Sequence, residues 1–496
     1  METLDNSIES IRKDKRFFGH PRGMGVLALG NFCNSAAWGA FYAILIFYLY
    51  APWMKGLGFS HGDAAMLVAA MGVGNSILGI VGSWLADRVL GMRKALIFGN
   101  LLKAAGMFMF AIPIGSQGLA RMFAFIGLLF LSFPIMGASN YSLTGQLYDR
   151  DDNKRRDSAF TVYGIVNSMA SLFIPALTAQ IGLLNYHIGF AIGGVFALLY
   201  GLSIFVTQHK FFGELGAKAT RPLNDVEKKR FSIIGICAIL LVLGVSILIS
   251  VFKFVTFTEV MNTISGLAFI IPIVFLFNLF HKKTLKEQDK KHLKAFLWFY
   301  TGQVLYFLGT TLLSTSVLVF IDTKIEQHFF GITIAPGSIQ TIYAILGLII
   351  GPFILFLWNK TRLGNLNTVL KYSLGLFFYA VGFTCLTLPA FIFIINGRHS
   401  AMWIVAFYLF VTISDQLLGA IGFSAVSKLA PVGEETQMQT AWGLGGTIAN
   451  GLALITFQQL QSVNEQLIIF PVMAVVFLCV FILFIVNIKR ISQLMV

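Results

Sequence analysis

Asp415 is the residue whose type and position in this sequence could most readily do chemistry. It is the only acidic side chain deep inside a long apolar stretch, which runs over residues 401–428. A carboxyl group in such surroundings can bind and release a proton near neutral pH, because desolvation disfavours its charged form. We therefore expect Asp415 to carry a proton. The alternative is a structural hydrogen bond to a neighbouring helix.

The other reactive residue types form no arrangement that would support catalysis or metal binding. The eight histidines show no pair at metal-ligand spacing, and the sequence has no nucleophile–base pair and no phosphate-binding glycine loop. We therefore expect no enzymatic activity, no metal and no cofactor. The four cysteines fall inside apolar stretches and are interpreted as small buried residues: Cys33, Cys237, Cys385 and Cys479.

A run of small and charged residues at 82–94 has the spacing G-x-x-x-x-D-R-x-x-G-x-R-K. Small residues let helices approach closely, and Asp87, at a helix end, can bond backbone donors or an arginine. Such a network could close the inner end of a cavity in one state and release it in another. The alternative is an ion-pair cluster that does not switch. The predicted gate comprises Gly82, Asp87, Arg88, Gly91, Arg93 and Lys94.

Polar and aromatic residues recur at i, i+3, i+4 and i+7 in several apolar stretches, which places them on one face of each helix. Such faces are typical of a polar, aromatic and almost uncharged pocket, although the same residue types also join membrane helices to each other. The predicted pocket residues are Asn31, Asn34, Ser35, Trp38, Tyr42, Asn140, Tyr141, Tyr300, Gln303, Tyr306, Asp415, Trp442 and Asn450.

Two lysines also fall inside apolar stretches, Lys103 at mid-span and Lys253 near the end of its span. Long basic side chains commonly extend toward the lipid–water interface. We expect Lys103 to do this or to bond carbonyl groups, and Lys253 to reach the interface. The alternative for Lys103 is a pair with Asp415, which would require its helix to reach the cavity.

The composition indicates a polytopic, all-α membrane protein. Hydrophobic types make up 57 % of the 496 residues and charged types only 12 %, whereas a soluble domain carries roughly 25 % charged residues. A soluble enzyme is therefore excluded. Because a membrane-crossing helix needs about 20 mostly apolar residues, the sequence predicts 14 spans. They cover 26–53, 63–86, 94–114, 119–147, 158–180, 186–207, 231–256, 263–281, 294–320, 337–358, 368–396, 401–428, 440–461 and 467–488.

The net charge of +14 is distributed asymmetrically along these spans. With the N-terminus in the cytoplasm, 30 of the 36 lysines and arginines fall in or beside inner segments and four in outer ones. Because basic loops stay on the cytoplasmic side, we expect both termini there. The positive charge then orients the chain and meets anionic lipid of the bilayer, and nucleic acid is not an expected partner.

Two basic loops divide the chain into two groups of six spans with a pair between them. The predicted segments are an N-terminal tail (1–25), a six-helix bundle (26–207), a linker (208–230), an inserted two-helix hairpin (231–281), a second linker (282–293), a second six-helix bundle (294–488) and a C-terminal tail (489–496).

The sequence G-S-W-L-A-D-R-V-L-G at 82–91 resembles the proton-dependent oligopeptide transporter family of the major facilitator superfamily. Similar stretches of the family are matched at 17–23, at 145–149 with 155–160, at 422–431, and by Trp442 with Asn450. The resemblance implies the major facilitator fold, two six-helix bundles around a central site. The inserted hairpin implies a prokaryotic member, in the cell membrane.

The sequence departs from this family where the family carries charge. The family's Glu-x-x-Glu-Arg motif aligns with Asn31 to Ser35, its helix-four lysine with Gly137, and a glutamate before a glutamine with Gly302. Asparagine can hydrogen-bond but cannot titrate. The resemblance leaves Asp415, at the place of the family's helix-ten glutamate, as the remaining acidic group, and a peptide carboxylate has no evident partner.

Together these features predict a secondary active transporter of di- and tripeptides that works by alternating access, with Asp415 as the proton-coupling group. The expected partners are a small peptide-like substrate, protons and the lipid bilayer. One alternative is a transporter of the same fold that moves another small polar solute or works as an uncoupled facilitator. Another is a non-transporting membrane sensor or assembly partner.

Overall fold

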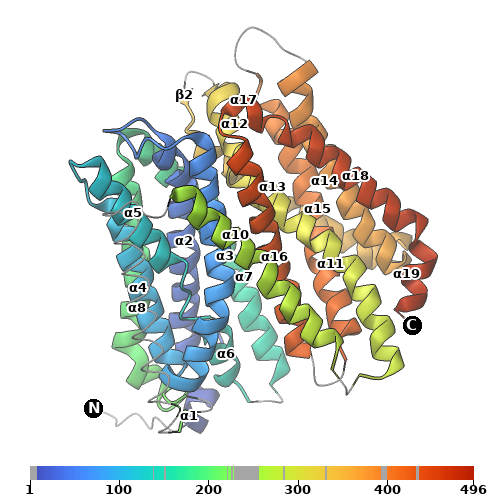
Figure 1. Cartoon of the computed structure of the whole chain (residues 1–496). Coiled ribbons are helices and arrows are strands. Elements are labelled where there is room, and N and C mark those ends of the chain that lie inside the picture. The colour runs from blue at the N-terminus through green and yellow to red at the C-terminus, as the bar shows by residue number, and fades with distance from the viewer. Residues whose placement is uncertain are drawn as a thin grey trace. The chain divides into compact units, whose positions relative to one another are not determined.

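The computed structural model describes residues 8–137, 139–149, 152–219, 222–224, 227, 256–282, 285–329, 332–392, 399–431 and 435–495. This part of the chain is almost entirely helical (Figure 1). Eleven of its helices are long and apolar enough to cross a membrane. The prediction of an all-α polytopic protein is confirmed.

The elements up to residue 280 are all helical. They are α1 (Ile8–Lys13), α2 (Arg22–Tyr50), α3 (His61–Leu85), the π-helix η1 (Ala86–Leu90), α4 (Met92–Ala111), α5 (Gln117–Leu131), α6 (Ser139–Gln146), α7 (Asn153–Leu184), α8 (Tyr186–Phe212) and α10 (Phe257–Phe280).

The remaining elements include one short antiparallel pair of strands, in which His328 pairs with Thr333. They are α11 (Glu287–Leu313), α12 (Ser316–Lys324), β1 (His328–Phe329), β2 (Ile332–Thr333), η3 (Pro336–Ile339), α13 (Gln340–Lys360), η4 (Arg362–Asn365), α14 (Thr368–Thr387), η5 (Leu388–Ile392), α15 (Met402–Leu429), α16 (Glu435–Gln459), α17 (Val463–Gln466), α18 (Ile469–Val486) and α19 (Ile488–Leu494).

Thirteen of the fourteen predicted spans overlap helices in the described part of the chain, and one of these, 119–147, is interrupted. The seventh span, 231–256, lies outside the described residues except for its last one, and so does Lys253. The α5–α6 segment and α16 are not among the eleven apolar helices. The first is interrupted, and the second carries several glutamine, threonine and asparagine residues.

The prediction of one continuous helix over 119–147 is wrong. Helix α5 ends at Leu131 and α6 begins at Ser139. Pro134 lies in the break, where it has no N–H to donate and cannot continue the helical ladder. The carbonyl of Pro134 lies so close to Gly82 of α3 that a Cβ at position 82 would collide with it.

The chain divides into two compact units. Unit 1 comprises Met1–Leu45, Trp53–Leu57 and Ile77–Val260, and unit 2 comprises Ile46–Pro52, Gly58–Ser76 and Met261–Val496. Each unit is a bundle of helices with its own core. The finer division into tails, bundles, linkers and hairpin stays a prediction.

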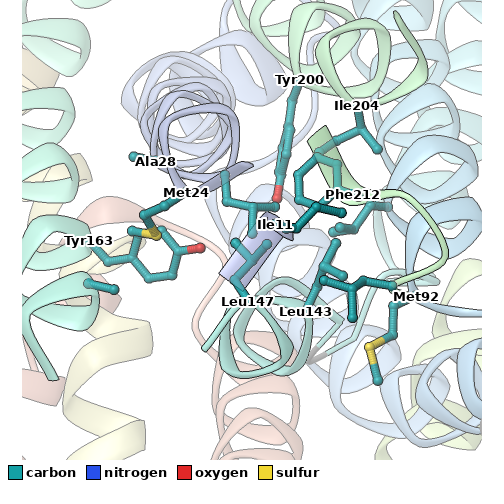
Figure 2. Packing of buried hydrophobic residues seen from close by; sticks show 14 of the residues in the cluster. Ile11, Met24, Ala28, Met92, Leu143, Leu147, Tyr163, Tyr200, Ile204 and Phe212 are labelled. Carbon is teal, nitrogen blue, oxygen red and sulfur yellow. The ribbon is translucent and has the colours of Figure 1, made fainter. Parts of the chain in front are cut away.

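The core of unit 1 gathers side chains from α1, α2, α4, α6, α7 and α8 (Figure 2). Ile11 of the short helix α1, Met24 at the start of α2 and Phe212 at the end of α8 all belong to this cluster. Ile11 therefore attaches the N-terminal segment to the bundle.

The core of unit 2 is rich in aromatic rings. Tyr379 of α14 stacks on Phe477 of α18, with ring centroids 4.7 Å apart and planes 7° from parallel. Phe383, one turn after Tyr379, lies 5.9 Å from the same ring. These offset contacts hold α14 against α18.

Helix α10, the described part of the predicted hairpin, packs on α16. The hydroxyl of Ser265 donates to the carbonyl oxygen of Gly451 at 3.3 Å. Several apolar side chains of α10 are exposed, among them Ile270, Ile273 and Phe277. An exposed apolar surface on a membrane helix suits contact with lipid.

Candidate functional site

Three of the predicted pocket residues in unit 1 belong to one hydrogen-bond network, in which Asn31 and Ser35 share the acceptor Asn167 of α7 and Asn140 bonds to Asn31. The amide oxygen of Asn167 accepts from Asn31 at 2.9 Å and from the hydroxyl of Ser35 at 2.7 Å. Asn140 of α6 donates to the amide oxygen of Asn31 at 3.3 Å. The network connects α2, α6 and α7, and Asn31 and Asn140 are buried within it.

The network continues along α7 to Tyr163. The Tyr163 hydroxyl lies 3.3 Å from the amide oxygen of Asn140 and also hydrogen-bonds with Thr144. Thr144 in turn donates to the backbone carbonyl of Asn140 at 2.9 Å. Unit 1 thus presents a chain of neutral amide and hydroxyl groups that are positioned by one another.

Lys103 of α4 bonds carbonyl oxygens, one of the two outcomes expected for it, but these oxygens belong to side-chain amides. Its side chain is buried, and its ammonium donates to the amide oxygen of Asn34 on α2. The ammonium also lies 3.4 Å from the amide oxygen of Asn100 and 5.4 Å from the centroid of the Trp38 ring. Neutral oxygens and an aromatic face therefore hold the cation.

Aromatic side chains border both groups of unit 1. Trp38 stacks on Tyr42 one turn later in α2, with ring centroids 5.5 Å apart. Tyr141 is half exposed and meets Tyr163 edge to face at 5.8 Å. These three predicted residues therefore pack beside the amide network or beside Lys103.

In unit 2, the carboxyl group of Asp415 on α15 lies beside two tyrosine hydroxyls, those of Tyr343 on α13 and Tyr379 on α14. Its Oδ2 atom accepts from the hydroxyl of Tyr343 on α13. Its Oδ1 atom is buried and has no partner among the described residues. The Tyr343 ring lies 5.9 Å from that of Tyr408, also on α15. The carboxyl group keeps one oxygen available for a proton or a ligand.

The predicted pocket residues of α11 differ in exposure. Gln303 is buried, with its Oε1 atom unpaired among the described residues. Tyr300 is also buried and packs against Phe296 at 5.4 Å. Tyr306 is half-buried and meets Tyr379 edge to face at 6.1 Å.

The two predicted residues of α16 make mainly packing and structural contacts. The Trp442 ring is buried between Phe296 and Phe423, 6.1 and 6.4 Å away. Asn450 accepts from Thr311 of α11 at 2.9 Å and donates to the carbonyl of Gly446 in its own helix. Asn450 thus joins α16 to α11.

Sequence reasoning missed Asn167, Tyr163 and Tyr343. A signal was present for Asn167, which is the only asparagine in the predicted span 158–180. Tyr343 carried no signal, because a tyrosine in an apolar span is equally typical of packing. Its role emerges only once α13 is placed against α15.

The arginines of the motif at 82–94 contact the end of α8 and residues that follow it. Arg88 forms a two-pronged ion pair with Glu227, at 3.2 and 3.1 Å, and its carbonyl accepts from the N–H of Leu223. Arg93 is buried and donates to the carbonyl of Gln208 at 2.6 Å. These contacts fix η1 and the start of α4 to Gln208, Leu223 and Glu227.

Asp87 and Lys94 do not take part in these contacts. Asp87 is exposed and has no hydrogen bond or ion pair with any residue that the structure describes, so the bond expected at this helix end is absent there. Lys94 is also exposed. In this structure, Arg88 and Arg93 make the contacts of the motif.

Replacing Gly91 with alanine is expected to destabilise unit 1 by about 1–3 kcal/mol. Gly91 joins η1 to α4 with φ of 76°, and a Cβ there would lie 2.9 Å from the carbonyl carbon of Lys218. The thermal unfolding midpoint of the purified protein in detergent measures the effect. Gly115→Ala, at a loop position with open space around it, is the control. Equal midpoints for both variants would contradict the prediction.

The N-terminal segment is held to unit 1 by a group that we call the N-terminal clasp: Arg12, Asp14, His20, Tyr148 and Arg155. Arg155 of α7 donates to the backbone carbonyls of Gly19, Arg12 and Asp14 at 2.8–3.0 Å. His20 is buried, with Nδ1 2.9 Å from the Tyr148 hydroxyl and Nε2 3.4 Å from the Ser158 hydroxyl.

Lowering the pH below about 6.5 is expected to destabilise the N-terminal clasp through His20. Burial, and then the nearby Arg155 guanidinium, lower the pKa of His20 from 6.5. The unfolded chain therefore takes up a proton more readily than the folded one, and stability falls as the pH falls. Unfolding midpoints from pH 5 to 8 test this. His20→Gln should flatten the profile, whereas His292→Gln on α11 should leave it unchanged. A profile that is unaltered in His20→Gln would refute the assignment.

Residues 93–475 match the family model described as "POT family". A "Di-/tripeptide transporter" of Lactococcus lactis subsp. lactis (strain IL1403) is 27 % identical over 458 residues, which cover 90 % of this chain and 91 % of the relative. An "Uncharacterized transporter YclF" of Bacillus subtilis (strain 168) is 28 % identical over 462 residues, covering 91 % of each chain.

Solved structures show the same fold. A peptide transporter POT crystallised with sulfate is 25 % identical and superposes with a TM-score of 0.90 over 98 % of this chain and 99 % of that one. A POT family transporter crystallised with 5-aminolevulinic acid is 23 % identical, with a TM-score of 0.88 over 98 % and 99 % of the two chains. The fold is therefore that of the major facilitator superfamily, as expected. Because the family model spans more than half of its length, this membrane protein belongs to the POT family.

Proposed function

We propose that this chain is a secondary active transporter of di- and tripeptides, located in the cell membrane with both termini in the cytoplasm. The observation that carries the proposal is the similarity to the Lactococcus lactis di-/tripeptide transporter, which extends over 90 % of this chain. Membership of the POT family supports it further. Transporters of this fold expose their substrate site to the two sides of the membrane in turn.

The predicted pocket residues of unit 1 suit the backbone of a short peptide. Asn31, Ser35 and Asn140 belong to a hydrogen-bonded network of amides and hydroxyls, and such groups match the N–H and C=O groups of a peptide. Trp38, Tyr42 and Tyr141 would supply aromatic contacts to side chains. In unit 2, Gln303 would supply an amide and Tyr306 an aromatic ring with a hydroxyl, for the same two kinds of contact.

Asp415 is the proposed proton-coupling group. Its Oδ2 atom is paired with Tyr343, and its Oδ1 atom has no partner among the described residues. A carboxyl group with one occupied and one available oxygen can bind either a proton or the ammonium of a peptide. Uptake driven by an inward proton gradient then requires that the proton on Asp415 and the peptide cross the membrane together and that the carboxyl group releases its proton on the cytoplasmic side.

The motif at 82–94 is proposed to gate the cytoplasmic side. Support comes from Arg88 and Arg93, which connect η1 and the start of α4 to Glu227 and Gln208. The ion pair of Arg88 with Glu227 is partly exposed, and such a pair can be broken and remade at small free-energy cost.

A specific observation favours a second candidate, an uncoupled facilitator for peptides or another small polar solute. Asn31 and Asn34 occupy positions at which the family resemblance implies carboxylates, and amides cannot release protons. If Asp415 alone does not couple transport, substrate would move only down its gradient.

Counterflow of labelled dialanine in proteoliposomes, at equal pH on both sides, tests the proposal without assuming coupling. We expect accumulation of label that unlabelled dipeptide blocks. An added proton gradient then separates the two candidates, because only a coupled transporter concentrates peptide against its gradient. Folded, inserted protein that gives no counterflow would refute peptide transport and favour a non-transporting role.

A further inference from the structure

Lys103 is a positively charged group in unit 1 to which the transport scheme above gives no role. It is 6 % exposed and lies near the middle of α4. Charged side chains inside membrane segments are costly and are usually retained for function. The question is what offsets its charge.

No described residue supplies the missing negative charge. Lys103 forms no ion pair with any described residue, and its neighbours are the amides of Asn34 and Asn100 and the Trp38 ring. Helices α2, α4, α5, α6 and α8 contain no aspartate or glutamate. Amide oxygens and an aromatic face stabilise a cation, but they leave its net charge in place.

The contact with Lys103 fixes the orientation of the Asn34 amide. An ammonium is only a donor, so the atom of Asn34 that faces it is the oxygen. The Nδ2 group therefore points away from Lys103 and has no partner among the described residues, and the Asn34 side chain is half-buried. Asn34 thus has N–H donors available for a ligand, and the ammonium of Lys103 lies on the opposite side of the same amide.

Asn167 also has N–H donors without a hydrogen-bond acceptor among the described residues. Its Oδ1 atom already accepts from Asn31 and from Ser35, the residue next to Asn34. Its Nδ2 group has no partner among the described residues, and its side chain is half-buried. Asn34 and Asn167 of unit 1 therefore both have unused N–H donors, whereas their amide oxygens are occupied. Unused donors of this kind favour a ligand that is rich in acceptors and negatively charged.

We propose that Lys103 and Asn34 form an anion subsite that binds the carboxylate of the transported peptide. The subsite lies on α4 and α2, and differs from the positions that the family resemblance assigned to basic residues, Ser35 and Gly137. It replaces our expectation that a free carboxylate has no partner in this protein. The inference rests on the proposed peptide transport and names the group that sets its specificity for the free acid.

The test compares dialanine with dialanine amide, which keeps the ammonium but lacks the carboxylate. Each compound competes against labelled dialanine in counterflow, at equal pH and constant ionic strength. A hydrogen bond to a charged group contributes about 1.5–3 kcal/mol, and 1.4 kcal/mol corresponds to tenfold in affinity. We therefore expect wild type to prefer the free acid by about tenfold or more.

Two variants locate this preference. Lys103→Met removes the charge and should bring the ratio of acid to amide affinity close to one. Asn34→Asp keeps the lysine but places a carboxylate beside it. This internal ion pair is compatible with folding, and because it neutralises the lysine it should also remove the preference for the free acid. Lys371→Met is the matched control, because Lys371 also lies over a tryptophan ring, that of Trp358 at 4.6 Å. It should keep the wild-type ratio.

The outcomes distinguish this inference from the proposed function. Wild type that transports neither compound would refute peptide transport itself. Transport with an acid preference that persists in both Lys103→Met and Asn34→Asp would overturn only the anion subsite. Chloride that stabilises wild type but not Lys103→Met, with no displacement by dialanine, would also overturn it, because the ammonium would then serve an inorganic anion.

Discussion

Replacing Asp415 with asparagine is expected to abolish proton-driven accumulation of dialanine while counterflow at equal pH continues. Asparagine keeps an oxygen for the Tyr343 hydroxyl but cannot release a proton. A transporter without a coupling group only equilibrates its substrate, so the inside-to-outside concentration ratio should fall to about one under an inward proton gradient. Uptake of labelled dialanine into proteoliposomes, with and without the gradient, measures this ratio.

Asp322 provides a matched control for this experiment. Its carboxylate also accepts from a tyrosine hydroxyl, that of Tyr50 at 2.6 Å, but it lies near the end of α12. Asp322→Asn should therefore still accumulate substrate under the gradient. Accumulation by Asp415→Asn at the wild-type level would show that coupling resides elsewhere or that the driving ion is not the proton.

Replacing Asn167 with alanine is expected to reduce transport by about tenfold or more. The substitution removes the oxygen that accepts from both Asn31 and Ser35. A buried donor left without an acceptor costs about 1–3 kcal/mol, and here the loss would also release the side chains that the network positions. Initial counterflow rates measure the loss, and the unfolding midpoint separates it from misfolding.

Ser168 is the adjacent residue and serves as the control. Its hydroxyl donates to the carbonyl of Gly164 within the same helix, at 2.9 Å, so Ser168→Ala should transport at the wild-type rate. If Asn167→Ala also transported at that rate, the amide network of unit 1 would have only a structural role.

The sequence was sufficient to predict the helices because apolar length alone decides which segments can cross a bilayer. It failed at residues 132–138, where the break between α5 and α6 lies inside a predicted span. Pro134 is a residue that can break a helix, but proline also lies within other long helices of this chain, such as Pro175 of α7. Whether a proline breaks a helix depends on its neighbours, which the sequence does not place.

The candidate site was predictable where residues share one helix face and uncertain where contacts join distant helices. Asn31 and Ser35 were identified from their spacing, but their common partner, Asn167, is more than 130 positions away. Bonds from Lys103 to carbonyl oxygens were among the expectations, but the sequence did not identify the acceptor, the amide of Asn34, 69 positions away. Such pairings follow from the packing of α2 against its neighbours, and this packing cannot be read from a single sequence.

The close approach of Gly82 to Pro134 has a consequence for how this chain can vary in evolution. The signature glycine of α3 has no room for a side chain because the carbonyl of Pro134, in the break between α5 and α6, occupies the space. The two positions are therefore expected to covary among homologues. Chains without a helix break at 134 are free to carry alanine or serine at 82, whereas chains that keep the break must keep the glycine. Glycine at position 82 would then be required by the path of the neighbouring α5–α6 segment as well as by the gate.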